Sequence, residues 1–361
     1  MIGQPDSALD TPALLVDLDR LEANIARIAA TCARHGVAWR PHAKVHKTPE
    51  IARLQLAAGA AGITCAKLGE AEAMADAGIR DILIANQIVG PIKMARLMRL
   101  LDRASPIVAV DSLANLAELG RAAAGRDPPL RVVIEVDLGM NRAGVEPGPP
   151  VVALAAAIAG QGGLRFVGLM GWESHCVAIA DTAAKERAVA AAIGLLTASA
   201  EACRRAGHAV EIVSCGGTGT FPYCAQQPGV TEVQVGGGIF GDVHYRTHAH
   251  VDGPCALTLL ATVTSRPTPH RIILDAGKKA LSGDAALPQP LGLGEIGQIR
   301  LSAEHATIEL ARPSETPRVG DRVAMIVGYS DTTVHLHERL VAIRNGRIAA
   351  LWRVAGRGRI D

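Results

Sequence analysis

The chain has 361 residues, of which 37 are Lys or Arg and 35 are Asp or Glu, so its net charge is only +2. This balance, together with the lack of a long basic run, argues against binding to nucleic acid. Aromatic residues make up 2% of the chain, too few for a surface on which single-stranded nucleic acid stacks. The seven cysteines are scattered without a Cys-x-x-Cys pair, which excludes a disulfide framework and a zinc ribbon.

The N-terminal segment carries acidic side chains where a secretory signal needs a basic start followed by an apolar run. No segment reaches the roughly 18 uninterrupted apolar residues of a membrane-spanning helix. We therefore expect a cytoplasmic protein without a membrane partner.

Short apolar runs alternate with Ala-rich amphipathic stretches from about residue 36 to residue 240. The predicted strands are Val37–Arg40, Gly62–Ala66, Ile82–Ala85, Ile107–Val110, Leu130–Val136, Arg165–Met170, Glu211–Cys215 and Glu232–Val235. The predicted helices between them include Leu68–Ala77, Ser112–Ala124, Pro150–Ala159 and Thr182–Ala206. Eight strand–helix repeats are the number in a (β/α)8 barrel of the TIM type, an α/β fold with a parallel sheet. A doubly wound open sheet has the same periodicity and is the alternative.

From about residue 255 the pattern changes to strands with few helical windows, which predicts a second, mostly β domain. The predicted strands of this part are Ala256–Arg266, Arg271–Asp275, Ala306–Leu310, Arg322–Val327 and Arg339–Asn345. The first strand of the chain, Ala13–Asp17, precedes a helix at Leu18–His35 and is expected to pair with this second domain. The predicted domains are therefore the barrel, residues 18–245, and the β domain, residues 1–17 plus 246–361.

The end of the first barrel strand reads Trp39-Arg40-Pro41-His42-Ala43-Lys44-Val45-His46-Lys47. Active sites of these barrels lie at the C-terminal ends of strands, and several cations are costly to bury without a purpose. A desolvated lysine near other cations is the type that forms a Schiff base with an aldehyde, which makes Lys44 a candidate. A surface turn with solvated charges is the alternative.

A second candidate follows the strand that ends at Val136. The segment Asp137-Leu138-Gly139-Met140-Asn141-Arg142 could place the Arg142 guanidinium on a cofactor oxygen. A structural ion pair between Arg142 and Asp137 explains the same residues equally well.

Two glycine-rich segments follow the last two strands: Ser214-Cys215-Gly216-Gly217-Thr218-Gly219-Thr220 and Gln234-Val235-Gly236-Gly237-Gly238-Ile239-Phe240-Gly241. Glycines let backbone N–H groups approach an anion, and the hydroxyls add donors. The second segment matches G-x-G-x-x-G, but a dinucleotide fold needs a helix next, and the following residues are polar and His-rich. Glycine loops after strands seven and eight match the phosphate site of barrel enzymes instead, and with Lys44 they suggest pyridoxal phosphate.

Together these segments resemble the alanine-racemase-like, fold-type III pyridoxal-phosphate enzymes, and within them the branch of D-threonine aldolase, D-serine dehydratase and 3-hydroxy-D-aspartate aldolase. The similarity extends from Thr11–Asp17 through the Arg40–Lys47 and Asp275–Ser282 segments to Trp352–Arg359. The Arg-Pro-His-x-Lys-x-His-Lys segment is specific to the family, whereas glycine loops alone are not.

The resemblance implies a cofactor, pyridoxal 5'-phosphate, held covalently by Lys44 with Arg142 near its phenolic oxygen. The other cofactor-binding residues that it implies are Trp172, Ser214, Gly217, Thr218, Gln234, Gly236 and Gly237. Gln234 stands where the racemases place an arginine facing the pyridine nitrogen. A neutral amide there does not keep that nitrogen unprotonated, so we expect a stronger electron sink than in a racemase. Trp172 replaces a tyrosine usual in this branch, and Gly238 replaces a tyrosine that reaches the phosphate.

Aldolases and dehydratases of this branch also bind a divalent metal in the C-terminal domain, through a His and, two residues on, an Asp or a Cys. Here Asp331 matches the aldolase type and suits Mn²⁺ or Mg²⁺, but Tyr329 replaces the expected His. His335 and His337 could substitute if residues 329–337 form a regular strand. His244, His248 and His250 form another loose cluster, and solvated histidines explain both groups as well.

The leading hypothesis is a lyase that cleaves a small β-hydroxy-D-amino acid by a retro-aldol reaction, with Lys44, His175 and Asp331 as catalytic residues. Glu173 and His175 are expected to face the substrate, and His175 is the candidate base for its hydroxyl. A dehydratase on the same substrates is the alternative, followed by a racemase or epimerase. A non-catalytic pyridoxal-phosphate carrier is less favoured, because such carriers are single barrels. The resemblance also implies a homodimer.

Overall fold

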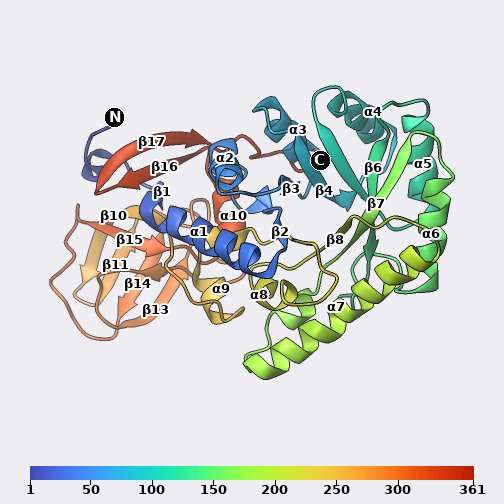
Figure 1. Cartoon of the computed structure of the whole chain (residues 1–361). Coiled ribbons are helices and arrows are strands. Elements are labelled where there is room, and N and C mark those ends of the chain that lie inside the picture. The colour runs from blue at the N-terminus through green and yellow to red at the C-terminus, as the bar shows by residue number, and fades with distance from the viewer. The chain divides into compact units, whose positions relative to one another are not determined.

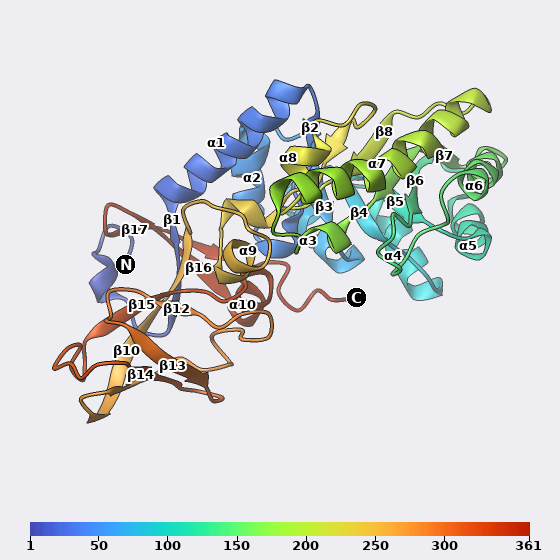
Figure 2. The ribbon, with the colours of Figure 1, turned by 90° about the horizontal axis from the view of Figure 1, so that it is seen from below.

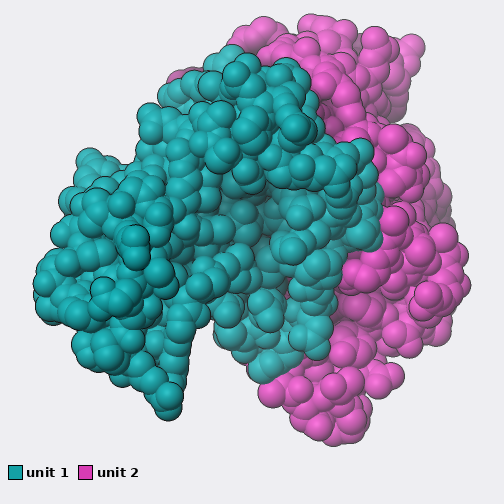
Figure 3. Space-filling view, turned by 90° about the vertical axis from the view of Figure 1, so that its left-hand side faces the viewer, with its two compact units in different colours: residues 1–25, 45–48, 237–357 teal, residues 26–44, 49–236, 358–361 magenta.

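The computed structural model describes all 361 residues, which form two compact units (Figures 1 and 3). Unit 1 consists of Met1–Ile25, Val45–Thr48 and Gly237–Arg357, and unit 2 of Ala26–Lys44, Pro49–Gly236 and Gly358–Asp361. The predicted bounds at residues 17/18 and 245/246 remain a proposal for the domains. No helix is both long and apolar enough to cross a bilayer.

Unit 2 contains the predicted barrel sheet. Its strands are β2 (Ala38–Trp39), β3 (Ile63–Cys65), β4 (Asp81–Gln87), β5 (Ser105–Val110), β6 (Leu130–Val136), β7 (Leu164–Gly171), β8 (Ile212–Cys215) and β9 (Glu232–Val233). Every neighbouring pair in the order β2-β9-β8-β7-β6-β5-β4-β3 is parallel. A parallel bridge between His42 and Thr64 joins the two ends of this order, so the strands close on themselves. The prediction of a TIM-type barrel is confirmed, and the open sheet is wrong.

The helices of the barrel lie along the outside of the strands (Figures 1 and 2). They are α2 (Pro49–Ala57), α3 (Leu68–Asp76), α4 (Pro91–Leu100), α5 (Leu113–Ala123), α6 (Pro149–Ala159), α7 (Thr182–Arg205) and α8 (Phe221–Cys224), while α1 (Leu18–His35) enters the unit from β1. Several of these helices begin at a capping side chain or a proline. The side chains of Ser112 and Asp181 accept the N–H groups of Asn115 and Ala184, and Pro91 begins α4.

Part of the barrel core is aliphatic, as the scarcity of aromatic residues leads one to expect. Strands β4 to β7 contribute one buried cluster, which consists of Leu83, Ile107, Ala109, Val133, Val167 and Met170. Branched side chains stack in layers inside such barrels, so no ring is needed to fill this volume.

Unit 1 is built on a nine-stranded sheet in the order β13-β14-β11-β10-β1-β16-β17, with β15 on β10 and β12 on β15. Its strands are β1 (Ala13–Asp17), β10 (Leu257–Thr268), β11 (Arg271–Leu274), β12 (Gln289–Pro290), β13 (Ile296–Leu301), β14 (Ala306–Leu310), β15 (Arg322–Ile326), β16 (Arg339–Arg344) and β17 (Arg347–Arg353). Strand β1 pairs antiparallel with β10 and parallel with β16, which confirms that the N-terminal strand belongs to the β domain. The pattern missed β12, β13 and β17, because their residues are largely exposed and β13 contains a glycine.

Gly168 provides a test of the barrel wall. A Cβ at this position of β7 would overlap the carbonyl oxygen of Ile212 in β8, and backbone atoms cannot rotate away. Gly168→Ala should therefore lower the free energy of unfolding by about 3 kcal/mol or more. Gly162→Ala is the matched control, because no atom lies within 4 Å of the Cβ it would add. Denaturant titration of both variants measures the difference, and equal stabilities would contradict this account of the β7–β8 contact.

Candidate active site

Lys44 lies just beyond the C-terminal end of β2, in a short 3₁₀ helix at Ala43–Val45. Its side chain is exposed, and its backbone N–H donates to Nδ1 of His42 at 3.5 Å. The polar side chains around it are not those of a solvated turn, since Arg40, His46 and Lys47 are all buried. The alternative of a surface turn is therefore wrong, and Lys44 is the exposed amine of an otherwise buried cationic segment.

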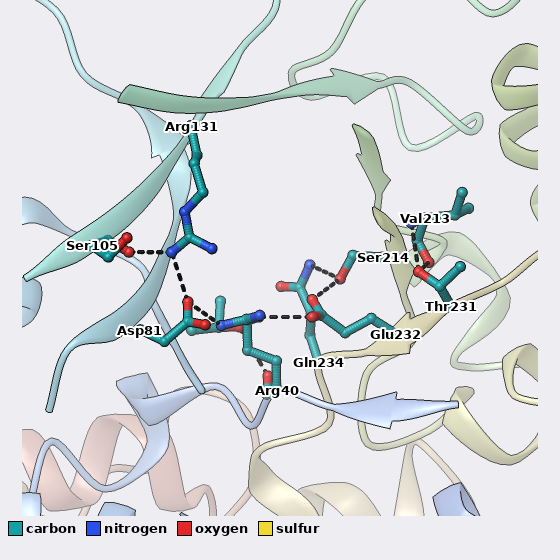
Figure 4. Close-up of polar contacts among 10 residues, drawn as sticks. Arg40, Asp81, Ser105, Arg131, Val213, Ser214, Thr231, Glu232 and Gln234 are labelled. Atoms are coloured by element: carbon teal, nitrogen blue, oxygen red, sulfur yellow. Dashed lines mark hydrogen bonds and ion pairs between the residues drawn. The ribbon is translucent and has the colours of Figure 1, made fainter. Parts of the chain in front are cut away.

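Arg40 is held by two carboxylates inside unit 2 (Figure 4). Its Nε lies 2.8 Å from Glu232 Oε2, and its Nη1 lies 2.9 Å from Asp81 Oδ1. Burial disfavours the charged guanidinium, but the two carboxylates outweigh this effect and raise the pKa of Arg40. Gly62 leaves room for this group, because a Cβ there would overlap the guanidinium. Sequence reasoning missed this arrangement, since Asp81 and Glu232 lie far from Arg40 in the chain.

Gln234 and Ser214 continue this chain of contacts (Figure 4). The amide nitrogen Nε2 of Gln234 donates to the Ser214 hydroxyl oxygen at 3.0 Å, and that hydroxyl donates to Glu232 Oε1 at 2.8 Å. The predicted cofactor residue Ser214 is fully buried in β8, which favours a role behind Gln234.

Arg142 pairs with Glu135, and not with Asp137 as considered from the sequence. Its Nη2 lies 3.6 Å from Oε1 of Glu135, a buried residue of β6, while Gln87 donates to Oε2 of Glu135 at 2.6 Å. Asp137 instead accepts the backbone N–H groups of Gly139 and Asn141, so the Arg142–Asp137 pair is wrong. Burial is the main cause that raises the pKa of Glu135.

The loop after β8 is tied down from behind by Glu173. This carboxylate accepts the Thr220 hydroxyl at 2.5 Å and the Gly216 N–H at 3.3 Å, and it is fully buried. The expectation that Glu173 faces a substrate is therefore wrong, because its oxygens are used inside the protein. Trp172 lies over the same loop, since a Cβ at Gly217 would overlap its ring. Thr218 is buried within the loop.

The loop after β9 passes close to the lysine segment. The N–H of His42 donates to the Gln234 carbonyl at 3.2 Å, and a Cβ at Gly236 would overlap the His42 carbonyl oxygen. Glycine at this position therefore allows the loop to approach the Lys44 segment. Gly237 belongs to unit 1, where a Cβ would overlap the ring of Tyr245.

His175 lies in a short 3₁₀ helix, Ser174–Cys176, after β7 and is exposed. Its Cε1 is 3.5 Å from the position that a Cβ of Gly139 would occupy, so it borders the loop that leads to Arg142. Exposure and this neighbour leave the imidazole accessible to a ligand at the mouth of the barrel.

Tyr329 and Asp331 lie in unit 1 at the start of helix α10 (Ser330–Leu336). The expectation of a strand here is wrong, so the pairing of Asp331 with His335 and His337 by strand alternation fails. On the helix Asp331 and His335 are four residues apart and share a face, whereas His337 lies beyond the helix and donates from Nε2 to the Ala280 carbonyl at 2.8 Å.

Tyr329 contacts several polar rings in unit 1. Its ring packs edge-on against His244, with centroids 4.9 Å apart, and against Tyr245 at 5.8 Å. Its hydroxyl hydrogen-bonds to both Tyr245 and Asp331. Burial, followed by the charge of Asp331, raises the pKa of Tyr329 well above its usual range, so the phenol is neutral. The predicted metal position is thus a hydrogen-bonded phenol and carboxylate.

The structure also brings together three buried side chains that no sequence motif indicated. One ligand atom from each of Glu173, Cys215 and Cys224 lies within 4.8 Å of the others. Burial is the main cause that raises the pKa of Cys224 well above its ordinary value, so the thiol is neutral and donates to Glu173. The cluster therefore supports the loop after β8.

Comparison with known proteins assigns both parts of the chain. The family model for the alanine racemase N-terminal domain matches residues 16–244, and a model for a serine dehydratase domain matches residues 256–343. The chain is 36% identical to a D-threonine aldolase from Arthrobacter sp, over 99% of this chain and 95% of that protein. It is 34% identical to a 3-hydroxy-D-aspartate aldolase from Paracoccus denitrificans, over 99% and 94% of the two proteins. The structure of a D-threonine aldolase from Filomicrobium marinum matches it with a TM-score of 0.96 at 34% identity, covering 100% of this chain and 99% of the other.

Glu173→Gln tests the support of the loop after β8. The amide keeps the shape of the side chain but turns one acceptor into a donor, so Gly216, Thr220 and Cys224 compete for the remaining oxygen. We expect a loss of about 2–4 kcal/mol in the free energy of unfolding. Glu186→Gln on the exposed face of α7 is the control and should change it by less than about 0.5 kcal/mol. Equal losses in both variants, measured by denaturant titration, would show that Glu173 does not hold the loop.

Proposed function

Because the chain belongs to the alanine-racemase-like, fold-type III family of pyridoxal-phosphate enzymes, we propose that it is a pyridoxal-phosphate-dependent lyase. The substrate is a β-hydroxy-D-amino acid, and a retro-aldol cleavage yields glycine, or a substituted analogue, and an aldehyde. The full-length similarity to D-threonine and 3-hydroxy-D-aspartate aldolases supports this assignment.

The donor set of the barrel suits pyridoxal phosphate. Lys44 supplies an exposed amine for the aldehyde, and the loop after β8 offers the Thr218 hydroxyl and backbone N–H groups for a phosphate. Gly236 brings the second loop against the Lys44 segment, where a side chain would not fit. The close approach of the Gly236 loop to the Lys44 segment is the observation that carries the proposal.

Each residue of this set has a proposed role. Lys44 holds the cofactor, Arg142 donates to its phenolic oxygen, and Gln234 faces its ring nitrogen. Gly217, Thr218, Gly236 and Gly237 bind the phosphate, and Trp172 covers the loop. When bound, pyridoxal phosphate supplies the electron sink that accepts the electron pair of the broken Cα–Cβ bond.

His175 is the proposed base for the substrate. Its imidazole is exposed next to the loop of Arg142, so it can accept the proton of the β-hydroxyl as the carbonyl of the aldehyde forms. The exposed imidazole, unlike the buried Glu173 carboxylate, has no role inside the protein that excludes this one.

A divalent metal does not fit Tyr329 and Asp331. Mn²⁺ and Mg²⁺ prefer carboxylate, carbonyl and water oxygens, and the neutral phenol of Tyr329 is a poor ligand. That phenol also hydrogen-bonds to Asp331, the one carboxylate of the pair. Asp331 therefore remains a proposed catalytic residue as a hydrogen-bond acceptor, and the proposed reaction takes no step through a metal at this pair.

A dehydratase is the second candidate, and the match of residues 256–343 to a serine dehydratase domain favours it. In that reaction Lys44 removes the α-proton and the β-hydroxyl leaves. A racemase or epimerase needs only the α-proton step, and no feature of unit 1 favours it. A homodimer is proposed from the family resemblance, and a location in the cytoplasm is proposed from the sequence.

Two measurements test the proposed function together: the products formed from D-amino acids, and the effect of replacing Lys44. With pyridoxal phosphate and D-threonine, D-phenylserine or D-serine, we expect glycine and an aldehyde from the first two. Lys44→Ala should lower the rate at least about 1,000-fold, the loss typical of a nucleophile or base that forms part of the reacting set. Borohydride should leave a pyridoxyl group on Lys44 in the native chain. Lys93→Ala, on helix α4, is the control and should keep both the rate and the mark.

Each alternative has its own result in this assay. Ammonia and a keto acid would identify the dehydratase, and inversion at Cα without cleavage would identify a racemase. A chain without any pyridoxyl mark would end the proposal.

Removal of metal tests the Tyr329–Asp331 pair. After dialysis against a chelator, the rate of aldehyde release should fall by less than about twofold, a change of roughly 0.4 kcal/mol in the activation free energy. Addition of Mn²⁺ should not raise it further. A large loss that Mn²⁺ restores would show that the site is a metal centre despite its phenol.

A further inference from the structure

A chain of three hydrogen bonds runs from a buried ion pair to Gln234 in unit 2 (Figure 4). Arg40 Nε donates to Glu232 Oε2 at 2.8 Å, the Ser214 hydroxyl donates to Glu232 Oε1 at 2.8 Å, and Gln234 Nε2 donates to Ser214 at 3.0 Å. Arg40, Ser214 and Glu232 are buried, whereas Gln234 is partly exposed. The chain thus connects the protein interior to a side chain that a ligand can reach.

The direction of each bond follows from the charge at the buried end. Arg40 always donates, so Glu232 faces it as a carboxylate, and a carboxylate only accepts. The single proton of Ser214 must therefore point to Glu232. Its oxygen can then only accept from Gln234, which requires the NH₂ group of the amide on that side. The two ends of the Gln234 amide are chemically distinguished by Arg40, three hydrogen bonds away.

We propose that Glu232 and Ser214 are positioning residues that hold Gln234 with its amide oxygen available to a ligand, so that this site accepts a hydrogen bond from a protonated ring nitrogen. The inference rests on the proposed function for the identity of that ligand, pyridoxal phosphate. It goes beyond that function because it fixes which end of the amide meets the ring and names the residues responsible.

The consequence is chemical. A ring nitrogen that carries a proton withdraws electrons more strongly than an unprotonated one, and an acceptor at Gln234 favours the protonated form. Breaking a carbon–carbon bond requires that electron withdrawal, so an oriented amide suits a lyase. A buried ion pair is costly to form, and here it determines an orientation.

The two carboxylates on Arg40 offer a matched pair of variants. Glu232→Gln and Asp81→Asn each remove one of the two negative charges that face the Arg40 guanidinium. Only Glu232 contacts Ser214, whereas Asp81 contacts Arg40 and Arg131. In Glu232→Gln the amide at position 232 can donate to Ser214, which frees the Ser214 proton for Gln234 and allows that amide to turn over.

The experiment follows the protonation of the cofactor by ¹⁵N NMR with pyridoxal phosphate labelled at the ring nitrogen and bound to the full chain. The native chain and Asp81→Asn should both give the signal of a protonated nitrogen. Glu232→Gln should shift the ratio of protonated to unprotonated nitrogen by about tenfold or more, equivalent to one unit in the pKa of the ring. An unprotonated nitrogen in the native chain, or equal shifts in both variants, would overturn the proposal.

Glu232→Gln could lose its signal simply by failing to fold. A second variant and a measurement without cofactor therefore test the same proposal independently. Ser214→Ala removes the hydroxyl without touching the ion pair and should move the same signal in the same direction. In the native chain without cofactor, the side-chain amide of Gln234 should show slowed proton exchange, and Ser214→Ala should remove that protection. Unchanged exchange in Ser214→Ala would overturn the positioning role. Absence of a pyridoxyl mark on Lys44 would instead defeat the proposed function, so the two failures are distinguishable.

Discussion

The barrel depends on one buried cation. Arg40 sits at the end of β2, a strand of only two residues, and its guanidinium reaches Glu232 on β9 and Asp81 on β4. Desolvating this group costs several kcal/mol, and the two carboxylates that meet it offset that cost. Backbone hydrogen bonds from Ala38, Arg40 and His42 to the β9 segment hold β2 together with this ion pair. The ion pair anchors the strand, and the anchored strand places Lys44 four residues later.

The loops around the lysine are shaped by what backbone atoms must approach. The absence of a side chain at Gly217 leaves space for the Trp172 ring. In the same way Gly236 leaves space for the His42 carbonyl, and Gly62 for the Arg40 guanidinium. A Cβ at Gly62 or Gly236 would also overlap a backbone oxygen, that of Asp81 or His42, which cannot rotate away. Behind the loops, Glu173 replaces water as the partner of Gly216 and Thr220. These contacts with Glu173 hold the loop after β8 in one conformation before a ligand binds. A binding site is preorganised when its loops are fixed in this way.

Two aromatic residues, Trp172 and Tyr329, have different surroundings in the two units. Trp172 in unit 2 packs on Gly217 of the loop after β8, where a Cβ would overlap its ring. Tyr329 in unit 1 is part of a group of rings with His244 and Tyr245 and hydrogen-bonds to Asp331. Trp172 therefore packs on a backbone loop, whereas Tyr329 places a neutral phenol beside a carboxylate.

The sequence by itself determined the eight barrel strands, the helix at Leu18–His35 and the C-terminal strands with strong apolar alternation, because burial periodicity is a local property. It also located Lys44, since a run of cations after an apolar strand is visible in the chain. Tertiary structure alone decided that the sheet closes, that residues 330–336 are helical, and that Arg142 pairs with Glu135 rather than with Asp137. It likewise decided that Glu173 turns inward and that Arg40 orders Gln234 through Glu232 and Ser214. These outcomes depend on partners many residues away, and the choice of a partner for a charged group is made by three-dimensional proximity and desolvation rather than by spacing along the chain.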